Sequence, residues 1–231
     1  MTVRTQQTES EYAKYGLSTL SQVPLPSQRV TLLSKLAKTS QGSPTWRARK
    51  LAEARDLFAL ETIAARLFIV ALDLTTELLA IVRMQVTTPC LPAGGELVVA
   101  GQVYLALRYP EEILHGPLPG YALVQIPTPR RVWHPNVSAE PPQHLCLGAN
   151  VPKGFPLREA VLGSYTALTL QSITLDPTDP AGIMNQDALA YWNDHQQRIP
   201  LSRAAFLDDP GTQPAGTPQP AGKTQRTGEA S

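Results

Sequence analysis

The sequence is poor in cysteine: Cys90 and Cys146 are the only two among 231 residues, and they form no CxxC pair. A disulfide scaffold and a four-cysteine zinc site both need more thiols, so both are excluded. Two isolated cysteines are typical of a reducing compartment, in which thiols stay reduced. We therefore expect a cytoplasmic protein.

An excess of one charge is lacking as well. The chain has 20 Lys and Arg against 19 Asp and Glu, which leaves a net charge of +1. Proteins that bind the phosphate backbone usually have a clear basic excess, so this balance argues against nucleic-acid binding.

Long hydrophobic runs are also missing. The longest apolar stretches lie near residues 67–72 and 97–107. Both are well short of the ~20 residues that a membrane span needs. Residues 1–7 lack the apolar stretch of a signal peptide. We expect no membrane segment.

Apolar residues make up 42% of the chain, which is enough to form a buried core. The two ends differ from the middle. Residues 1–44 are rich in Ser, Thr and Gln, and we expect a flexible extension in which residues 29–38 form a short helix. That helix could dock on the main domain or on a partner. Residues 207–231 are rich in Pro and Gly and predict a disordered tail. The domain is placed at residues 45–206.

The middle of the chain alternates between two hydrophobic periods. Steps of three and four residues predict helices, and alternation over short runs predicts strands. Thr45 is a candidate cap for the first helix. In chain order the expected elements are a helix over Trp46–Phe68, strands over Ile69–Thr75, Leu78–Val86, Leu97–Tyr109 and Tyr121–Ile126, and helices over Leu157–Leu175 and Asn185–Arg198. Sequential strands with short connections favour an antiparallel meander, so we predict an α+β fold with helices at both ends of a four-stranded sheet.

The stretch Pro127–Pro156 is about thirty residues long and irregular. Loops of that length are usually functional or disordered, and apolar residues such as Trp133 and Leu145 argue against disorder. It contains His134-Pro135-Asn136 and, ten residues after Asn136, Cys146 between two leucines. This pattern indicates a positioned thiol beside a rigid polar group. A leucine-flanked structural cysteine is the alternative.

These residues resemble the ubiquitin-conjugating (E2) enzymes, and the similarity extends from about Trp46 to Arg198. The ordered matches are the third strand and its proline (Val103–Pro110), the proline-rich turn and fourth strand (Gly116–Val124), the HPN motif (Val132–Val137), the cysteine with its leucines (Leu145–Leu147), the helix end and loop beyond it (Leu170–Pro177) and the next helix (Asp187–Trp192). The resemblance implies a UBC-like fold and a transferase that needs no cofactor.

The sequence also departs from the family pattern. Gly148 stands where the family usually has an acidic residue, and the tryptophan common after the cysteine is missing. The spacer between Asn136 and Cys146 is about two residues longer than usual. These departures favour the E2-like proteins of bacterial conjugation operons, often linked to antiphage defence. The resemblance then implies an E1-like activating enzyme, a ubiquitin-like protein, a protein substrate and a JAB-type isopeptidase as partners.

The resemblance assigns a role to Cys146 and two candidate roles to Asn136. Cys146 would accept the ubiquitin-like C-terminus from the E1 by transthiolation, as a thiolate. Asn136 would either donate to the oxyanion formed during transfer or only brace its loop. His134 is expected to be structural, because the family's chemistry needs no histidine base.

Charged residues complete the expected site. Asp179 or Asp176 would orient the incoming lysine and take up its proton, although either could simply cap the next helix. Arg47, Arg49 and Lys50 open the first helix, where family members dock an acidic E1 domain. The competing interpretation of these three is a solvated helix face.

Three other functions fit the residue types. A cysteine hydrolase would pair Cys146 with His144 or His134. A metal site would combine Cys90 and Cys146 with the same histidines, but their spacing is not that of a ligand set. The third is a catalytically inactive E2-like binding module that keeps the fold and loses the role of the cysteine.

Overall fold

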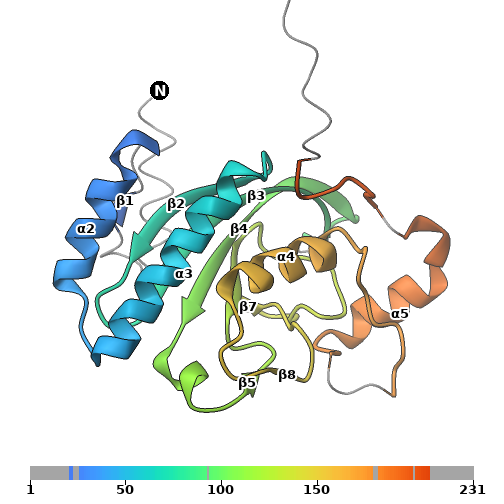
Figure 1. Ribbon diagram of the computed structural model, residues 1–231. Helices are drawn as coiled ribbons and strands as arrows, with labels where there is room; N and C mark the ends of the chain where they lie inside the picture. The colour runs from blue at the N-terminus through green and yellow to red at the C-terminus, as the bar shows by residue number, and fades with distance from the viewer. Residues whose placement is uncertain (1–20, 23–25, 93, 179–181, 200, 209–231) are drawn as a thin grey trace, which may run out of the picture.

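The structure is a computed structural model of the 231-residue chain, and it describes residues 21–22, 26–92, 94–178, 182–199 and 201–208. Its centre is an antiparallel sheet, with helices α3 (Pro44–Thr62) and α4 (Leu157–Leu168) packed on one face (Figure 1). Helix α2 (Arg29–Thr39) lies beside α3, and α5 (Gln186–Asp194) lies at the far end of the molecule. The predicted α+β class is confirmed.

The six-stranded sheet has the order β1-β2-β3-β4-β6-β7, and every pairing is antiparallel. Its four central strands follow one another along the sheet as a meander: β2 (Leu67–Asp73), β3 (Leu78–Cys90), β4 (Val98–Tyr109) and β6 (Val124–Thr128). The short strands β1 (Ser21–Gln22) and β7 (Gln143–His144) form the edges. A separate pair joins β5 (Leu118–Pro119) to β8 (Asn150–Val151). The expected four strands are therefore present, within a larger sheet.

Helix α3 begins and ends earlier than predicted. The hydroxyl of Ser43, rather than Thr45, accepts the N–H of Trp46 at 3.1 Å, and a proline occupies the first turn. The helix ends at Thr62 instead of Phe68. Leu67 begins β2, whose side chains alternate between buried and half-buried along its first four residues. The apolar residues after position 62 belong to a strand. Over so short a run, apolar residues at helical spacing do not distinguish a helix from a strand.

The later helices are also shorter than expected. Helix α4 ends at Leu168, because Leu170 adopts a left-handed φ of 59° that a helix cannot continue. Helix α5 starts where predicted, with the side chain of Asn185 accepting the N–H of Ala188 at 3.0 Å, and ends at Asp194. Within the described residues, no helix is both long and apolar enough to cross a bilayer.

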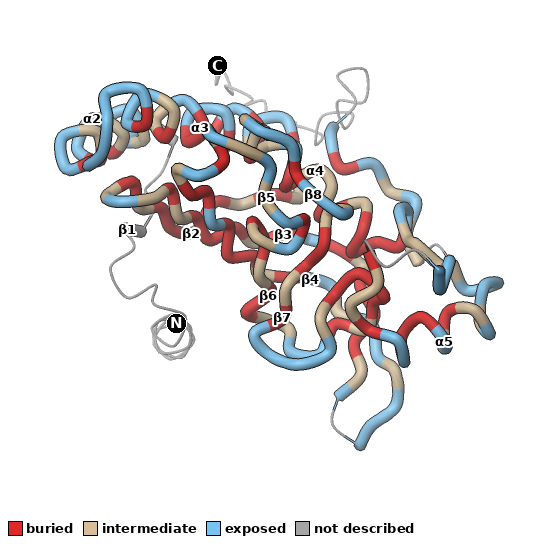
Figure 2. Tube along the Cα trace, turned by 90° about the horizontal axis from the view of Figure 1, so that it is seen from below, coloured by how far each residue is buried: buried red, intermediate tan, exposed pale blue. Residues whose placement is uncertain are grey.

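The core lies between the sheet and helices α3 and α4, where the central strands are largely buried (Figure 2). Leu32 and Leu36 of α2 belong to the same buried cluster. The short predicted helix therefore docks on the domain, and the folded part of the chain begins upstream of residue 45. Phe206 joins the core too, with its ring 4.7 Å from that of Tyr165. Residues 1–20 and 209–231 lie outside the described part of the chain.

Candidate functional site

The stretch Pro127–Pro156 folds back on itself and brings Asn136 beside Cys146. The N–H of Cys146 donates to the carbonyl of Asn136 at 2.8 Å, and Val137 forms a bridge with Leu145. On its other side, the N–H of Leu147 donates to the carbonyl of Gly120 at 3.1 Å. The cysteine thus lies on an extended segment that is hydrogen-bonded to chain on both sides.

His134 fixes the turn of the HPN motif from inside the protein. Its side chain is fully buried, and Nδ1 accepts the N–H of Asn136 at 3.0 Å. Burial lowers the pKa of His134 to about 3, and the backbone of Ala167 opposes that shift only in part. The imidazole is therefore neutral at pH 7. This geometry agrees with the structural role expected for it.

Helix α5 holds the same motif from the opposite side. The carbonyl of Pro135 accepts the N–H groups of Met184 and Asn185 at 2.7 and 3.1 Å. The indole Nε1 of Trp192 donates to the carbonyl of Trp133 at 3.1 Å. Three backbone-directed bonds therefore tie the HPN turn to the start and the body of α5.

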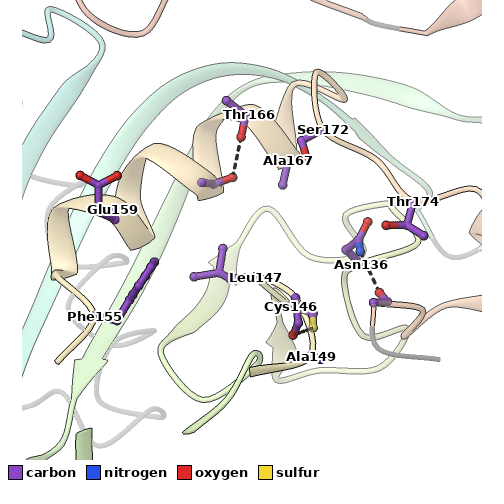
Figure 3. Close-up of a pocket in the computed structure, with 13 residues that line it drawn as sticks. Asn136, Cys146, Leu147, Ala149, Phe155, Glu159, Thr166, Ala167, Ser172 and Thr174 are labelled. Atoms are coloured by element: carbon purple, nitrogen blue, oxygen red, sulfur yellow. Dashed lines mark hydrogen bonds between the residues drawn. The ribbon is translucent and has the colours of Figure 1, made fainter. Parts of the chain in front are cut away.

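Cys146 and Asn136 line one cleft of about 260 Å³ (Figure 3). Helix α4 forms one wall and the segment after the cysteine forms another. In Figure 3, Phe155 and Glu159 lie toward one end of the cleft, and Asn136 and Thr174 lie toward the other. The remaining lining residues are Leu147, Gly148, Ala149, Gly163, Thr166, Ala167, Ser172 and Gly182.

The thiol of Cys146 lies at the surface of this cleft, but little of the residue is exposed. Its relative exposure is 7%, and Sγ donates to the carbonyl of Gly148 at 3.0 Å. Gly148 has a φ of 119°, which favours glycine. A Cβ on Gly120 would lie 1.7 Å from the Gly148 oxygen and 3.1 Å from Sγ. The position of the thiol therefore depends on glycine at both places.

Asn136 as a residue is 8% exposed, and its side chain is held by the segment before α5. Its Nδ2 donates to the carbonyl of Gly182 at 2.8 Å, whereas Oδ1 is buried and has no hydrogen-bond partner among the described residues. A Cβ on Gly182 would lie 2.7 Å from Nδ2, so a larger residue there would displace the amide.

Of the two predicted carboxylates, Asp176 is not among the described residues that line the cleft. Asp176 is exposed, and its carboxylate accepts the N–H and the hydroxyl of Thr178 at 2.8 and 2.7 Å. These bonds lower the pKa of Asp176. Asp176 therefore stabilises the turn from residue 176 to residue 178 and does not cap the next helix. Asp179 lies outside the described residues.

Among the described residues that line the cleft, Glu159 is the acidic one, and sequence reasoning did not single it out. It shares one face of α4 with Gly163 and Thr166, which follow at steps of four and three residues. That helical spacing was the available signal. This spacing identifies Glu159 as a site residue only when the position of the cleft against α4 is already known.

Of the three cations expected at an E1-docking surface, Arg47 alone is exposed. Arg49 pairs with Glu53 at 2.6 Å and also donates to the Tyr109 hydroxyl and the Gly154 carbonyl. The second Glu53 oxygen accepts the N–H of Leu157, which is the first residue of α4. Arg49 therefore links α3 to the start of the helix that walls the cleft.

Lys50 is fully buried, so its prediction as a docking residue is wrong, and so is its interpretation as part of a solvated face. Its Nζ donates to the carbonyls of Gln41, Leu74, Thr75 and Thr76 at 2.7 to 3.1 Å. Burial lowers the pKa of Lys50. The ammonium joins the chain before α3 to the turn between β2 and β3.

The remaining residues of the alternative sites are dispersed. Nδ1 of His144 lies 3.3 Å from the carbonyl of Tyr121, and neither His144 nor His134 is among the described residues that line the cleft. Cys90 is buried at the end of β3, where burial raises its pKa to about 11. Within the described ranges, no cluster of three or more His, Cys, Asp or Glu residues could hold a metal ion.

Comparison of the chain with models of protein families, with curated proteins and with solved structures finds no match.

Proposed function

We propose that this protein is an E2-like conjugating enzyme with a UBC-like fold, in which Cys146 carries a ubiquitin-like protein as a thioester. The observation that supports this most directly is the pairing of Cys146 with Asn136. One backbone hydrogen bond joins the two residues, and both face the same cleft. A helix, an antiparallel meander, an HPN turn, a cysteine and further helices follow in the order that the resemblance implies.

The proposed reaction has two steps, and each exchanges one bond at a carbonyl carbon. In the first, the Cys146 thiolate attacks the E1 thioester, a new C–S bond forms and the E1 thiolate leaves. In the second, an amine of the target attacks the Cys146 thioester, a C–N bond forms and the Cys146 thiolate leaves. The amine loses one proton to solvent or to the leaving thiolate. No cofactor or metal takes part in either step.

The wider setting belongs to the same proposal. An E1-like enzyme and a ubiquitin-like protein would be the direct partners, and a JAB-type isopeptidase would act in the same pathway. The departures at Gly148 and in the spacer between Asn136 and Cys146 favour a bacterial, antiphage-type conjugation system in the cytoplasm. Arg47 is the one predicted docking residue whose exposure suits contact with an E1.

An inactive binding module is the second candidate, and one observation favours it. Cys146 is only 7% exposed, and its thiol is engaged by the carbonyl of Gly148. A bulky acyl group on Sγ requires that contact to break. The hydrolase alternative has less support, because Nδ1 of His134 already accepts a backbone N–H and the buried ring stays neutral.

The experiment is a charging assay with an E1-like enzyme, its ubiquitin-like protein and ATP. We expect a band shift on a non-reducing gel that disappears with thiol. Cys146→Ala should abolish the shift, and Cys146→Lys should trap a thiol-resistant amide. Cys90→Ala is the matched control and should charge like the wild type.

Two results would overturn the proposal. Charging that persists in Cys146→Ala would exclude the cysteine mechanism. A wild type that never charges, although the E1 forms its own thioester in the same tube, would favour the binding module.

A further inference from the structure

The orientation of the Asn136 amide limits what this side chain can offer to a substrate. The carbonyl of Gly182 is an acceptor, so the group 2.8 Å from it must be the amide nitrogen, and the oxygen must face the other way. Figure 3 shows this arrangement, with the nitrogen turned toward the Gly182 carbonyl and the oxygen turned away from it.

The oxygen is therefore the polar atom of Asn136 that remains to be satisfied. Oδ1 is buried and has no hydrogen-bond partner among the residues that the structure describes, and the side chain as a whole is more than nine-tenths buried. Buried polar groups in native proteins are almost always paired, and an orphan at a site calls for a functional explanation. The lining of the cleft includes Asn136, so a group bound there is the natural source of a donor.

We propose that Oδ1 of Asn136 accepts an N–H from the attacking amine and orients it toward the thioester on Cys146. This inference rests on the proposed function and gives Asn136 a role that differs from oxyanion stabilisation. An oxyanion needs a donor, and the bond to Gly182 occupies one of the two N–H groups of Nδ2, whereas Oδ1 has no partner among the described residues. An amine nucleophile carries N–H groups, and an acceptor beside the thioester fixes the direction of its lone pair.

The geometry also explains why the amide stays in this orientation. The nitrogen is held by Gly182, at which a Cβ would lie only 2.7 Å away. The backbone carbonyl of Asn136 is occupied by the Cys146 N–H, and its own N–H by His134. The residue is thus fixed on three sides, and Oδ1 is the acceptor that has no partner among the described residues.

In the transfer step, the amine nitrogen forms a bond to the thioester carbon and the C–S bond to Cys146 breaks. One N–H remains directed at Oδ1 throughout, and the other proton leaves to solvent or to the departing thiolate. A thiol attacks as the thiolate, whose sulfur carries no hydrogen to donate, so the reacting atom gains nothing from Oδ1. The ratio of the amine rate to the thiol rate therefore measures the contribution of the contact between Oδ1 and the amine.

The test uses the full-length protein, charged at Cys146 with a short synthetic peptide α-thioester that ends in Gly-Gly. The charged form is mixed with free lysine or with 2-mercaptoethanol, and both discharge rates are followed by intact mass spectrometry. The readout is the ratio of the amine rate to the thiol rate. We expect Asn136→Ala to lower this ratio about 10- to 100-fold. Thr62→Ala, which removes a hydroxyl at the exposed end of α3 outside the lining of the cleft, should leave it within about twofold.

Asn136→Asp distinguishes the two roles, because they predict opposite changes of the ratio relative to Asn136→Ala. Both variants lose the bond to Gly182, but aspartate keeps an acceptor. If Oδ1 receives the amine, the ratio for Asn136→Asp should lie above that for Asn136→Ala. If the side chain serves an oxyanion, a carboxylate should be the worse substitution, and discharge to both nucleophiles should fall together. That result, or an unchanged ratio in Asn136→Ala, would overturn the inference and leave the charging reaction intact. Failure of the wild type to charge would instead count against the proposed function.

Discussion

The two cysteines flank the same segment, 132–136, yet their surroundings differ in kind. Cys90 ends the long strand β3 and bridges Val132, where the segment begins. Cys146 donates its N–H to Asn136, where the segment ends. The first thiol is enclosed by a sheet, and burial raises its pKa to about 11. The second lines a cleft. Cys90 is therefore an apolar residue of the core, whereas Cys146 lies beside polar groups of the cleft.

Alkylation gives the largest expected difference between the two thiols. At pH 8 a thiol with a pKa of about 11 is ionised to only about one part in a thousand, so Cys90 should react on the order of several hundredfold more slowly than an ordinary thiol. Iodoacetamide labelling followed by peptide mass spectrometry measures both sites in one sample. Modification of Cys90 should accelerate as the pH approaches 11. Equal labelling of both sites at pH 8 would contradict the comparison.

A methyl group added near each thiol should give the next largest contrast. Gly120→Ala places a Cβ 1.7 Å from the Gly148 carbonyl, which requires the backbone to shift. We expect a loss of about 2 to 3 kcal/mol in the free energy of unfolding, measured by urea denaturation. Gly101→Ala, in the strand that pairs with the end of β3, meets nothing within 4 Å. This control should stay within about 0.5 kcal/mol of the wild type.

His134, which lies between the two cysteines in the fold, should make stability depend on pH. Its pKa is about 3 in the folded state and about 6.5 when unfolded, so the unfolded chain binds more protons between these values. Stability is therefore lost as the pH falls through 6.5. The expected loss from pH 7 to pH 5 is about 2 kcal/mol from this residue. Denaturation of His134→Gln at both pH values should show a loss smaller by that amount.

The smallest effect is expected at Asp176. Its carboxylate is exposed and bonded to Thr178, outside the lining of the cleft. Asp176→Asn should therefore change the rate of amine discharge by less than about twofold, measured with the charged protein and free lysine. The matched variant Glu159→Gln, measured in the same assay, tests the carboxylate that lines the cleft. A tenfold drop in Asp176→Asn alone would restore the role that its position in the sequence suggested.

The strands and the order of elements were predictable because their signals are local. Alternation in Val98–Tyr109 and the Asn185 cap of α5 both depend on neighbours within a few residues. The helix ends were less predictable, since Leu170 leaves the helical region of φ although its apolar surroundings continue the pattern. The antiparallel sheet followed from the short connections between the strands.

The site was predictable only as a set of residue types. The motif named Asn136 and Cys146, but the contacts of Asn136 with Gly182 and of Cys146 with Gly120 join parts of the chain distant from one another. Lys50 is the opposite case, because the sequence predicted a surface residue and the structure buries it. A charged residue at the start of a helix is usually solvated, and no local pattern reveals four converging carbonyls.

The glycines around the thiol have a practical consequence for anyone who wishes to alter acceptor preference. Substitutions at Gly120 or Gly182 would collide with atoms of the site itself, and Gly148 adopts a left-handed backbone. The adjustable wall is α4, where a Cβ on Gly163 would lie 3.4 Å from a methyl group of Leu147 and where Thr166 also lines the cleft. Combinatorial libraries directed at that helix, with the glycines held constant, should retain folded clones at far higher frequency than libraries spread evenly around the cleft.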